Sequence, residues 1–285
     1  MENPIIVALD LPSPQKALKI AEELAPVVGA FKVGKQLFIS GGPDVLRKLR
    51  ATGAKVFLDL KLHDIPNTVA KAVMAATDLG VQMTTVHAAG GSAMLAAAGN
   101  AAHEQAAMLR SEPPLVLAVT VLTSMDDGDL AELGIEGGAQ EHVLRLAKLA
   151  IGAGLKGLVC SPQEIELLRA ELGEEVQLVT PGIRPESAKS DDQKRTMTPS
   201  EAIKAGANWL VIGRPITGAA DPKAAAIGIL HSIDPELVPE GERPEPIPEV
   251  VDCAECGKNL KIDATEQATG RYHCPYCDKD VVHQR

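Results

Sequence analysis

Short runs rich in Val, Ile and Leu alternate along the first 231 residues with longer stretches whose apolar residues recur at helical spacing. The first pattern is typical of buried strands and the second of amphipathic helices. Seven helical segments separate the apolar runs, and an eighth follows the last run at residues 221–231. The pattern therefore predicts eight β units, with strands at residues 5–10, 30–34, 55–61, 83–88, 114–123, 157–161, 177–183 and 209–214.

Two predicted helices, at residues 13–24 and 162–172, have a serine followed by a proline at their start, Ser13-Pro14 and Ser161-Pro162. This order is typical of an N-cap residue with proline at the first helical position. A third helix is expected near residue 67, where Asn67 would cap it after Pro66.

Eight β units with intervening helices predict a (β/α)8 TIM barrel, and a doubly wound open sheet is the competing architecture. The barrel is preferred because polar residues recur where the apolar runs end. In a barrel these ends converge on one face, whereas an open sheet would spread them along a line. The residues are Asp10, Lys32, Asp59, Lys61, His87, Thr123, Ser161, Arg184 and Arg214.

The third strand carries charge into an apolar run, within the segment DLKLHDIPNT at residues 59–68. Side chains alternate along a strand, so Phe57, Asp59 and Lys61 share one face, with ~6.6 Å between the two charged residues from a rise of ~3.3 Å per residue. A structural salt bridge at the barrel rim is one interpretation. Lys32 ends the neighbouring strand, and with Asp64 it would complete an array in which each charge lies between opposite charges.

Such an array keeps the Lys61 ammonium protonated and fixed in place. A fixed ammonium suits a general acid, or a group that stabilises a developing carbanion. The residue types therefore predict proton-transfer chemistry at the end of the third strand.

Several motifs together resemble the orotidine 5′-phosphate decarboxylase family, in the family's order and spacing over residues 1–231. The resemblance implies a dimeric (β/α)8 barrel that converts orotidine 5′-monophosphate to uridine 5′-monophosphate and CO2 without a metal or organic cofactor. The block DLKLHDIPNT is the most specific of these motifs. The others are VALD (7–10), FKVG (31–34), VHAAGG (86–91), LTS (122–124), TPGIR (180–184), DDQKR (191–195) and VIGRPIT (211–217).

The resemblance also implies roles for single residues. Lys61 resembles the proton donor to C6 of the pyrimidine, and Asp59 the carboxylate that faces the substrate's carboxylate. Lys32 resembles the lysine that contacts this aspartate and the ribose. Asp64 and Thr68 resemble the part supplied by the neighbouring subunit of a homodimer.

The resemblance extends to substrate binding. Asp10 is similar to a ribose ligand and Thr123 to a pyrimidine contact. The polar segment 184–199 has the features of a lid over the phosphate. The phosphate and lid contacts would come from Arg184, Gln193, Gly213 and Arg214.

Composition changes after residue 231. Residues 233–250 hold five prolines and six acids against one arginine, which predicts an extended linker between a catalytic domain at 1–232 and a module at 251–285. In the module, Cys253-x2-Cys256 and Cys274-x2-Cys277 are separated by 17 residues. This spacing predicts a zinc-ribbon-like module with a structural zinc ion on the four cysteines.

Charge and composition bound the function. The net charge of −10 argues against a general nucleic-acid or anionic-membrane surface, and the module's six acids and five basic residues lack a basic stripe and indicate no particular partner. The N-terminus lacks a targeting pattern, so a cytoplasmic protein is expected. Two alternatives stay open: a metal-dependent sugar-phosphate decarboxylase or aldolase of the same barrel superfamily, and a non-catalytic barrel that carries the zinc module.

Overall fold

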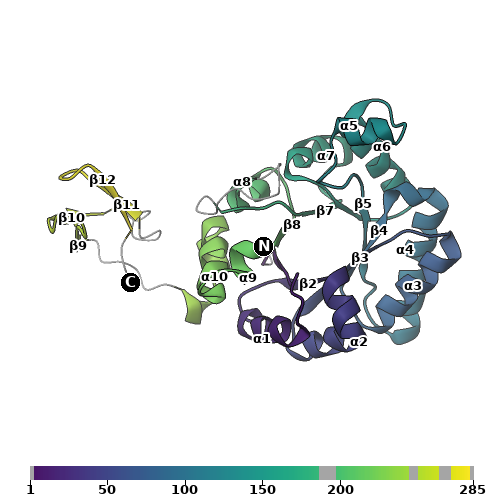
Figure 1. The fold of residues 1–285 in the computed structure, drawn as a ribbon, viewed down its shortest axis with the longest axis horizontal. Helices are drawn as coiled ribbons and strands as arrows, with labels where there is room; N and C mark the ends of the chain where they lie inside the picture. Colours follow the sequence, from purple (N-terminus) through teal and green to yellow (C-terminus); the bar gives the residue numbers. More distant parts are fainter. Residues whose placement is uncertain (1–2, 186–196, 244–249, 263–270, 283–285) are drawn as a thin grey trace. The chain divides into compact units, whose positions relative to one another are not determined.

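The computed structural model describes residues 3–185, 197–243, 250–262 and 271–282. Within these ranges, eight parallel strands close a barrel in sequence order (Figure 1). Since β8 pairs with β1, the predicted TIM barrel is confirmed and the open sheet is excluded. The strands are β1 (Ile5–Ala8), β2 (Ala30–Gly34), β3 (Lys55–Leu62), β4 (Met83–His87), β5 (Leu115–Val119), β6 (Gly157–Val159), β7 (Gln177–Thr180) and β8 (Trp209–Ile212).

Helices surround the ring of strands (Figure 1). Two connections differ from the predicted alternation: α5 and α6 both lie between β5 and β6, and the short α9 precedes the trailing helix α10. The helices are α1 (Pro14–Leu24), α2 (Lys35–Ala51), α3 (Pro66–Asp78), α4 (Gly91–Leu109), α5 (Asp127–Glu132), α6 (Gly138–Gly152), α7 (Ile165–Leu172), α8 (Pro199–Lys204), α9 (Arg214–Thr217) and α10 (Pro222–Ile233).

Most of the strands end earlier than the apolar runs predicted. The fifth run was expected to continue to residue 123, whereas β5 ends at Val119 and leaves Thr123 in the following loop. The pairing of β5 with β4 and with β6 ends at Val119, so β5 does not continue beyond this residue. The polar ends of the runs therefore lie in the βα loops and at the strand ends.

The barrel has two apolar clusters, one on each side of the sheet. The inner cluster includes Ile6, Phe57, Leu117 and Val211, and the outer cluster lies between strands and helices. On β3, Phe57 belongs to the inner cluster, whereas Leu58, Leu60 and Leu62 belong to the outer one or pack against it. The predicted separation of the two faces of this strand is confirmed.

The N-cap residue of α1 is the predicted one, whereas the N-cap residue of α3 is not. Ser13 accepts a hydrogen bond from the N–H of Lys16 and caps α1, as predicted. The prediction for Asn67 is wrong, because α3 begins at Pro66 and Ile65 occupies the N-cap position. Proline favours the first helical position, which moves the cap to the residue before it. In the predicted 162–172 helix, residues 162–164 form a 3-10 turn that precedes α7.

Chain contacts divide the protein into two compact units, Met1–Pro239 and Glu240–Arg285. The first unit extends beyond residue 232 because Val238 is buried in the outer core of the barrel. Residues 235–237, which were expected to be extended, form a 3-10 turn. The sequence did not predict this attachment, because the many acids and prolines around Val238 indicated an extended linker.

The second unit contains two antiparallel hairpins. In one, β9 (Val250–Asp252) pairs with β10 (Asn259–Lys261), and in the other β11 (Arg271–Cys274) pairs with β12 (Lys279–Val282). A small core that includes Val251, Leu260, Tyr272 and Val281 joins them. Each Cys-x2-Cys motif therefore lies at the tip of a hairpin.

Helix α4 spans 19 residues and α2 spans 17. No helix in the described part of the chain has the length and apolar character that a bilayer crossing requires.

Candidate active site

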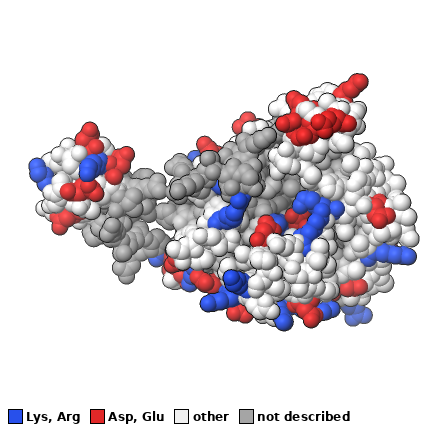
Figure 2. Space-filling view, in the orientation of Figure 1, with Lys and Arg blue, Asp and Glu red and all other residues white. Residues whose placement is uncertain are grey.

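A cavity of about 340 Å³ opens where the barrel strands end. Its volume suits a small-molecule ligand. Around the centre of the barrel end seen in Figure 2, acidic and basic side chains lie side by side. The predicted site residues that line the cavity are Asp10, Lys32, Asp59, Lys61, Thr123, Arg184, Gly213 and Arg214.

Four of these side chains form a chain of alternating charge. The Lys32 ammonium lies 2.9 Å from Asp10 and 3.6 Å from Asp59. Lys61 donates to both oxygens of Asp59, at 2.7 and 2.8 Å. Lys32 and Asp59 are buried, so the centre of the array lies within the site, whereas Asp10 at one end of it is exposed. In the single chain, the second carboxylate of the array is Asp10 and not the expected Asp64.

The surroundings of Asp59 favour its charged form. Burial by itself raises the pKa of this carboxyl. The ammonium groups of Lys32 and Lys61 act in the opposite direction, and so do the hydrogen bonds from Lys61 and Thr85. The result is a pKa below the ordinary value of 3.8, and Asp59 is therefore a carboxylate at neutral pH.

Sequence reasoning missed Thr85 on β4. The Thr85 hydroxyl is fully buried, accepts a hydrogen bond from the N–H of Lys61 at 2.8 Å and donates to Asp59 at 3.0 Å. The signal in the sequence was the polar pair Thr84-Thr85 inside an apolar strand. Alternation alone does not tell which of the two threonines faces the site.

The cavity has an apolar part that was not predicted as a group. Ala8, Phe57, Val119, Val159 and Val211 line it from the barrel interior. Because these residues exclude water, they strengthen electrostatic interactions within the site. Further lining residues outside the prediction are Val121, Leu122, Pro181, Gly182 and Thr217.

Three of the predicted residues are not brought into the cavity of the described chain. Asp64 is exposed and accepts a hydrogen bond from the N–H of Ile65 at 2.6 Å. Thr68 is also exposed, in the first turn of α3. Gln193 and residues 186–196 of the expected lid lie outside the described residues.

His63 and His87 lie beside the array, with ring centroids 5.4 Å apart and planes inclined by 37°. Burial and the neighbouring His63 lower the pKa of His87, so its ring is neutral at neutral pH. Neither ring lines the cavity.

Residues 3–229 match the sequence profile of the orotidine 5′-phosphate decarboxylase / HUMPS family. The chain belongs to this family. Two decarboxylases show the strength of the match. "Orotidine 5′-phosphate decarboxylase" of Shewanella sediminis is 52% identical over 231 residues, covering 81% of this chain and 97% of the relative. The enzyme of the same name from Moorella thermoacetica is 51% identical over 234 residues, covering 82% and 93%.

Solved structures agree with this membership of the orotidine 5′-phosphate decarboxylase / HUMPS family. The crystal structure of orotidine 5′-phosphate decarboxylase from Lactobacillus acidophilus has a TM-score of 0.73 and 41% identity, and covers 82% of this chain and 100% of its own. The enzyme of that name from Pyrococcus horikoshii has a TM-score of 0.65 at 26% identity, covering 80% and 98%. The resemblance inferred from the motifs is confirmed.

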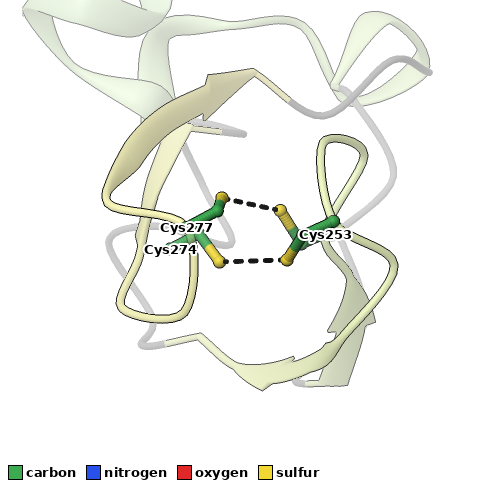
Figure 3. A group of neighbouring side chains, drawn as sticks. Cys253, Cys274 and Cys277 are labelled. Carbon is green, nitrogen blue, oxygen red and sulfur yellow. Dashed lines mark hydrogen bonds between the residues drawn. The ribbon is translucent and has the colours of Figure 1, made fainter.

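The family match ends before the four-cysteine group begins. The sulfur atoms of Cys253, Cys256, Cys274 and Cys277 all lie within 4.8 Å of one another. Cys253 and Cys277 are 3.8 Å apart, Cys256 and Cys274 are 3.7 Å apart, and the thiols face one another in Figure 3. Tetrahedral zinc with Zn–S bonds of about 2.3 Å requires sulfur separations of about 3.8 Å. The cluster therefore fits such a metal.

The two cysteine turns have the same backbone form. Gly257 follows Cys256 with a φ of 71° and donates its N–H to the carbonyl of Cys253. Asp278 follows Cys277 with a φ of 57° and donates to the carbonyl of Cys274. Both turns thus aim two sulfurs at one point. The exposed His273 ring contacts Asp278 and Asp280, and His283 lies outside the described residues.

Proposed function

We propose that this protein is an orotidine 5′-phosphate decarboxylase, which forms uridine 5′-monophosphate and CO2 in pyrimidine biosynthesis. The observation that carries the proposal is the array Asp10–Lys32–Asp59–Lys61, whose four members line the cavity. The curated relatives that carry this name, at about 50% identity over most of the chain, support it.

Asp59 raises the energy of the bound substrate. In the proposed complex its carboxylate faces the carboxylate on C6 of the pyrimidine. At ~4 Å and an effective dielectric of ~20, two like charges repel by about 4 kcal/mol. Relief of this repulsion as CO2 leaves contributes roughly 10³-fold to the rate. The remaining acceleration must come from stabilisation of the carbanion.

Lys61 supplies that stabilisation and then the proton. When the bond from C6 to the carboxylate breaks, its electron pair stays on C6 and CO2 departs. The Lys61 ammonium, which Asp59 holds by two hydrogen bonds, faces this developing charge and transfers a proton to C6. Lys32 keeps Asp59 charged during the step and contacts the ribose.

Binding remote from C6 offsets the repulsion. Arg184, Arg214 and the backbone at Gly213 line the cavity after β7 and β8, where TIM barrels commonly bind phosphate. The proposal assigns the phosphate to these groups with Gln193, the ribose to Asp10 and the pyrimidine to Thr123. Residues 184–199 act as the lid.

The enzyme is proposed to work as a homodimer. Asp64 and Thr68 are exposed and lie outside the cavity of their own chain, beside Ile65, whose side chain is 66% exposed. The proposal is that a partner subunit covers this exposed segment. Asp64 and Thr68 would then complete the partner's site.

The reaction is proposed to need no cofactor, because Asp59 and Lys61 together account for carboxylate loss and protonation. The four cysteines are proposed to hold a structural Zn²⁺, since four thiolates fill a tetrahedral site. Nothing in this scheme involves a membrane or nucleic acid, and the cytoplasm stays the expected location.

The decisive experiment is turnover of orotidine 5′-monophosphate by the full chain with and without a chelator. The expected result is decarboxylation that the chelator does not slow. The reaction is monitored by the decrease in absorbance as the product forms. Lys61→Ala should lower kcat by roughly 10²- to 10⁴-fold, the usual contribution of a general acid. Lys148→Ala, at an exposed ion pair with Glu171, is the control and should keep full activity.

Metal-dependent turnover of a sugar phosphate, with none of orotidine 5′-monophosphate, would replace this proposal by the aldolase-type alternative. An inactive wild type with a folded barrel would favour the scaffold alternative.

A further inference from the structure

Strands β3 and β4 fall out of register beside the charged array. Leu58 pairs with Thr84 and Leu62 pairs with Val86. Between these pairs β3 has three residues, Asp59, Leu60 and Lys61, whereas β4 has only Thr85. One buried threonine therefore faces the whole segment that carries the two catalytic groups.

The bulge places Lys61 in a backbone conformation that residues other than glycine rarely adopt. Its φ is 53°, in the left-handed region, which costs free energy for a residue other than glycine. Such a conformation persists only where the surroundings hold it. The holding contact is the 2.8 Å hydrogen bond from the Lys61 N–H to the Thr85 hydroxyl, which takes the place of a ladder partner.

The same hydroxyl also binds the other catalytic residue. A threonine hydroxyl has one proton to donate, and Thr85 gives it to Asp59 at 3.0 Å while accepting from Lys61. Since the Thr85 side chain is fully buried, water does not compete with its hydroxyl for the hydrogen bond to Lys61 or for the one to Asp59. One oxygen atom thus ties the backbone of the proton donor to the carboxylate that faces the substrate.

We propose that Thr85 is a positioning residue for the decarboxylation, holding the left-handed backbone of Lys61 and one oxygen of Asp59 in register with each other. This inference rests on the proposed function of Asp59 and Lys61. It predicts that the hydroxyl, rather than the volume of the side chain, is needed for fast chemistry.

Strand β4 supplies a matched control in Thr84. It is as fully buried as Thr85, but it pairs with Leu58 of the outer cluster, and its hydroxyl has no hydrogen-bond partner among the described residues. Threonine and valine have nearly the same shape. Thr84→Val therefore removes a buried hydroxyl from the same strand without touching the array.

The test compares kcat and KM for orotidine 5′-monophosphate in Thr85→Val, Thr85→Ser and Thr84→Val. Thr85→Val should lower kcat by on the order of 10- to 100-fold, the value of a hydrogen bond to a charged group, with KM unchanged. Thr85→Ser keeps the hydroxyl and should stay near the wild-type kcat, as should Thr84→Val. Thr85→Ala carries the same test if Thr85→Val does not fold.

A second readout is independent of turnover. In a ¹³C titration of the Asp59 carboxyl, Thr85→Val should raise its pKa because a hydrogen bond to the carboxylate is lost, and Thr84→Val should not. The titratable groups around Asp59 are Lys32 and Lys61, with Asp10 beyond Lys32 and His87 at the end of β4, and they are the same in both variants.

An active wild type with an unimpaired Thr85→Val variant would overturn the positioning role, and so would a Thr85→Ser variant as slow as Thr85→Val. A wild type without turnover would refute the proposed function instead. In that case the titration still decides whether Thr85 controls Asp59.

Discussion

At the scale of single residues, the site depends on charges that are buried only because they are paired. Asp59 and Lys32 would be costly to bury alone. Asp10 and Lys61 lie at the two ends of the array and balance them, at 2.9 Å from Lys32 and 2.7 Å from Asp59. The four residues therefore act as one unit, and removing Lys32 or Lys61 should raise the pKa of Asp59.

The pKa of Asp59 is the most direct measure of this coupling. Its pKa lies below 3.8 in the folded chain, so ionised Asp59 contributes stability above that pH and loses it as the pH falls through the folded pKa. In Lys61→Ala we expect the pKa to rise, because an ammonium and its hydrogen bonds are gone. Because the folded and unfolded pKa values then lie closer together, the acid-dependent loss of stability should be smaller than in the wild type and should be complete at a higher pH.

A ¹³C titration of the carboxyl groups, together with urea unfolding at a series of acidic pH values, measures both effects. Arg47→Ala serves as the control, since it removes an exposed ion pair with Asp44 on α2, and neither residue lines the cavity. An Asp59 pKa that is the same in wild type and Lys61→Ala would contradict the coupling.

At the scale of secondary-structure elements, two irregular backbone segments hold the proposed catalytic and metal-binding groups. The bulge on β3 sets Asp59 and Lys61 against Thr85, and the two hairpins of the second unit set the cysteines against one another. In both places a residue other than glycine has a positive φ, Lys61 in the barrel and Asp278 in the second hairpin. Each conformation lies beside side-chain groups that meet there, Asp59 and Lys61 in the barrel and the cysteine sulfurs in the second unit.

The hairpins should need their metal. The second unit is small, and its buried core holds few residues outside the cysteines, so metal binding should supply much of its folding free energy. We expect purified protein to contain about one zinc ion per chain. Cys253→Ser should lose the zinc and the protection of the hairpin amides from hydrogen exchange.

Cys160→Ala is the matched control for zinc. Cys160 is buried in the barrel core, where burial raises its pKa to about 12, and it is not part of the four-cysteine group. Zinc content should be unchanged in this variant. Full zinc content in Cys253→Ser would show that the four cysteines are not the zinc site.

At the scale of the whole molecule, the barrel and the four-cysteine unit are separate compact bodies. The cavity is lined by residues of the barrel, from Ala8 to Thr217. The proposed chemistry therefore belongs to the first unit, whereas the proposed assembly requires a second copy of the chain. The exposed positions of Asp64 and Thr68 are the reason for this requirement.

Mixing two inactive variants tests the shared site. Asp64→Ala and Lys61→Ala subunits are each expected to be nearly inactive alone. In a random mixture, half of the dimers are mixed and each has one intact site, so roughly a quarter of the wild-type activity should return. The measurement is turnover after the two variants are unfolded together and refolded.

The control for this experiment mixes Lys61→Ala with Asp59→Asn. Both residues belong to the same chain's site, so no exchange of subunits restores an intact set. Recovery in the control, or none with Asp64→Ala, would rule out a site completed by the partner.

The amino-acid sequence by itself determined the barrel, the inward placement of Asp59 and the four-cysteine group. These features follow from local rules, namely the alternation of side chains on a strand, the count of β units and the spacing of the cysteines. The family motifs added the residues that line the cavity, including Arg184 and Arg214. Element ends were less certain, as Ile65 in place of Asn67 at the start of α3 shows.

Only the tertiary structure decided which groups meet across strands. The register shift between β3 and β4 selects Thr85 over Thr84, and the approach of β1 to β2 brings Asp10 to Lys32. Packing likewise attached Val238 to the barrel despite its acidic, proline-rich surroundings. Such contacts depend on how neighbouring elements are aligned, and a pattern read along one strand carries no information about the register of the next.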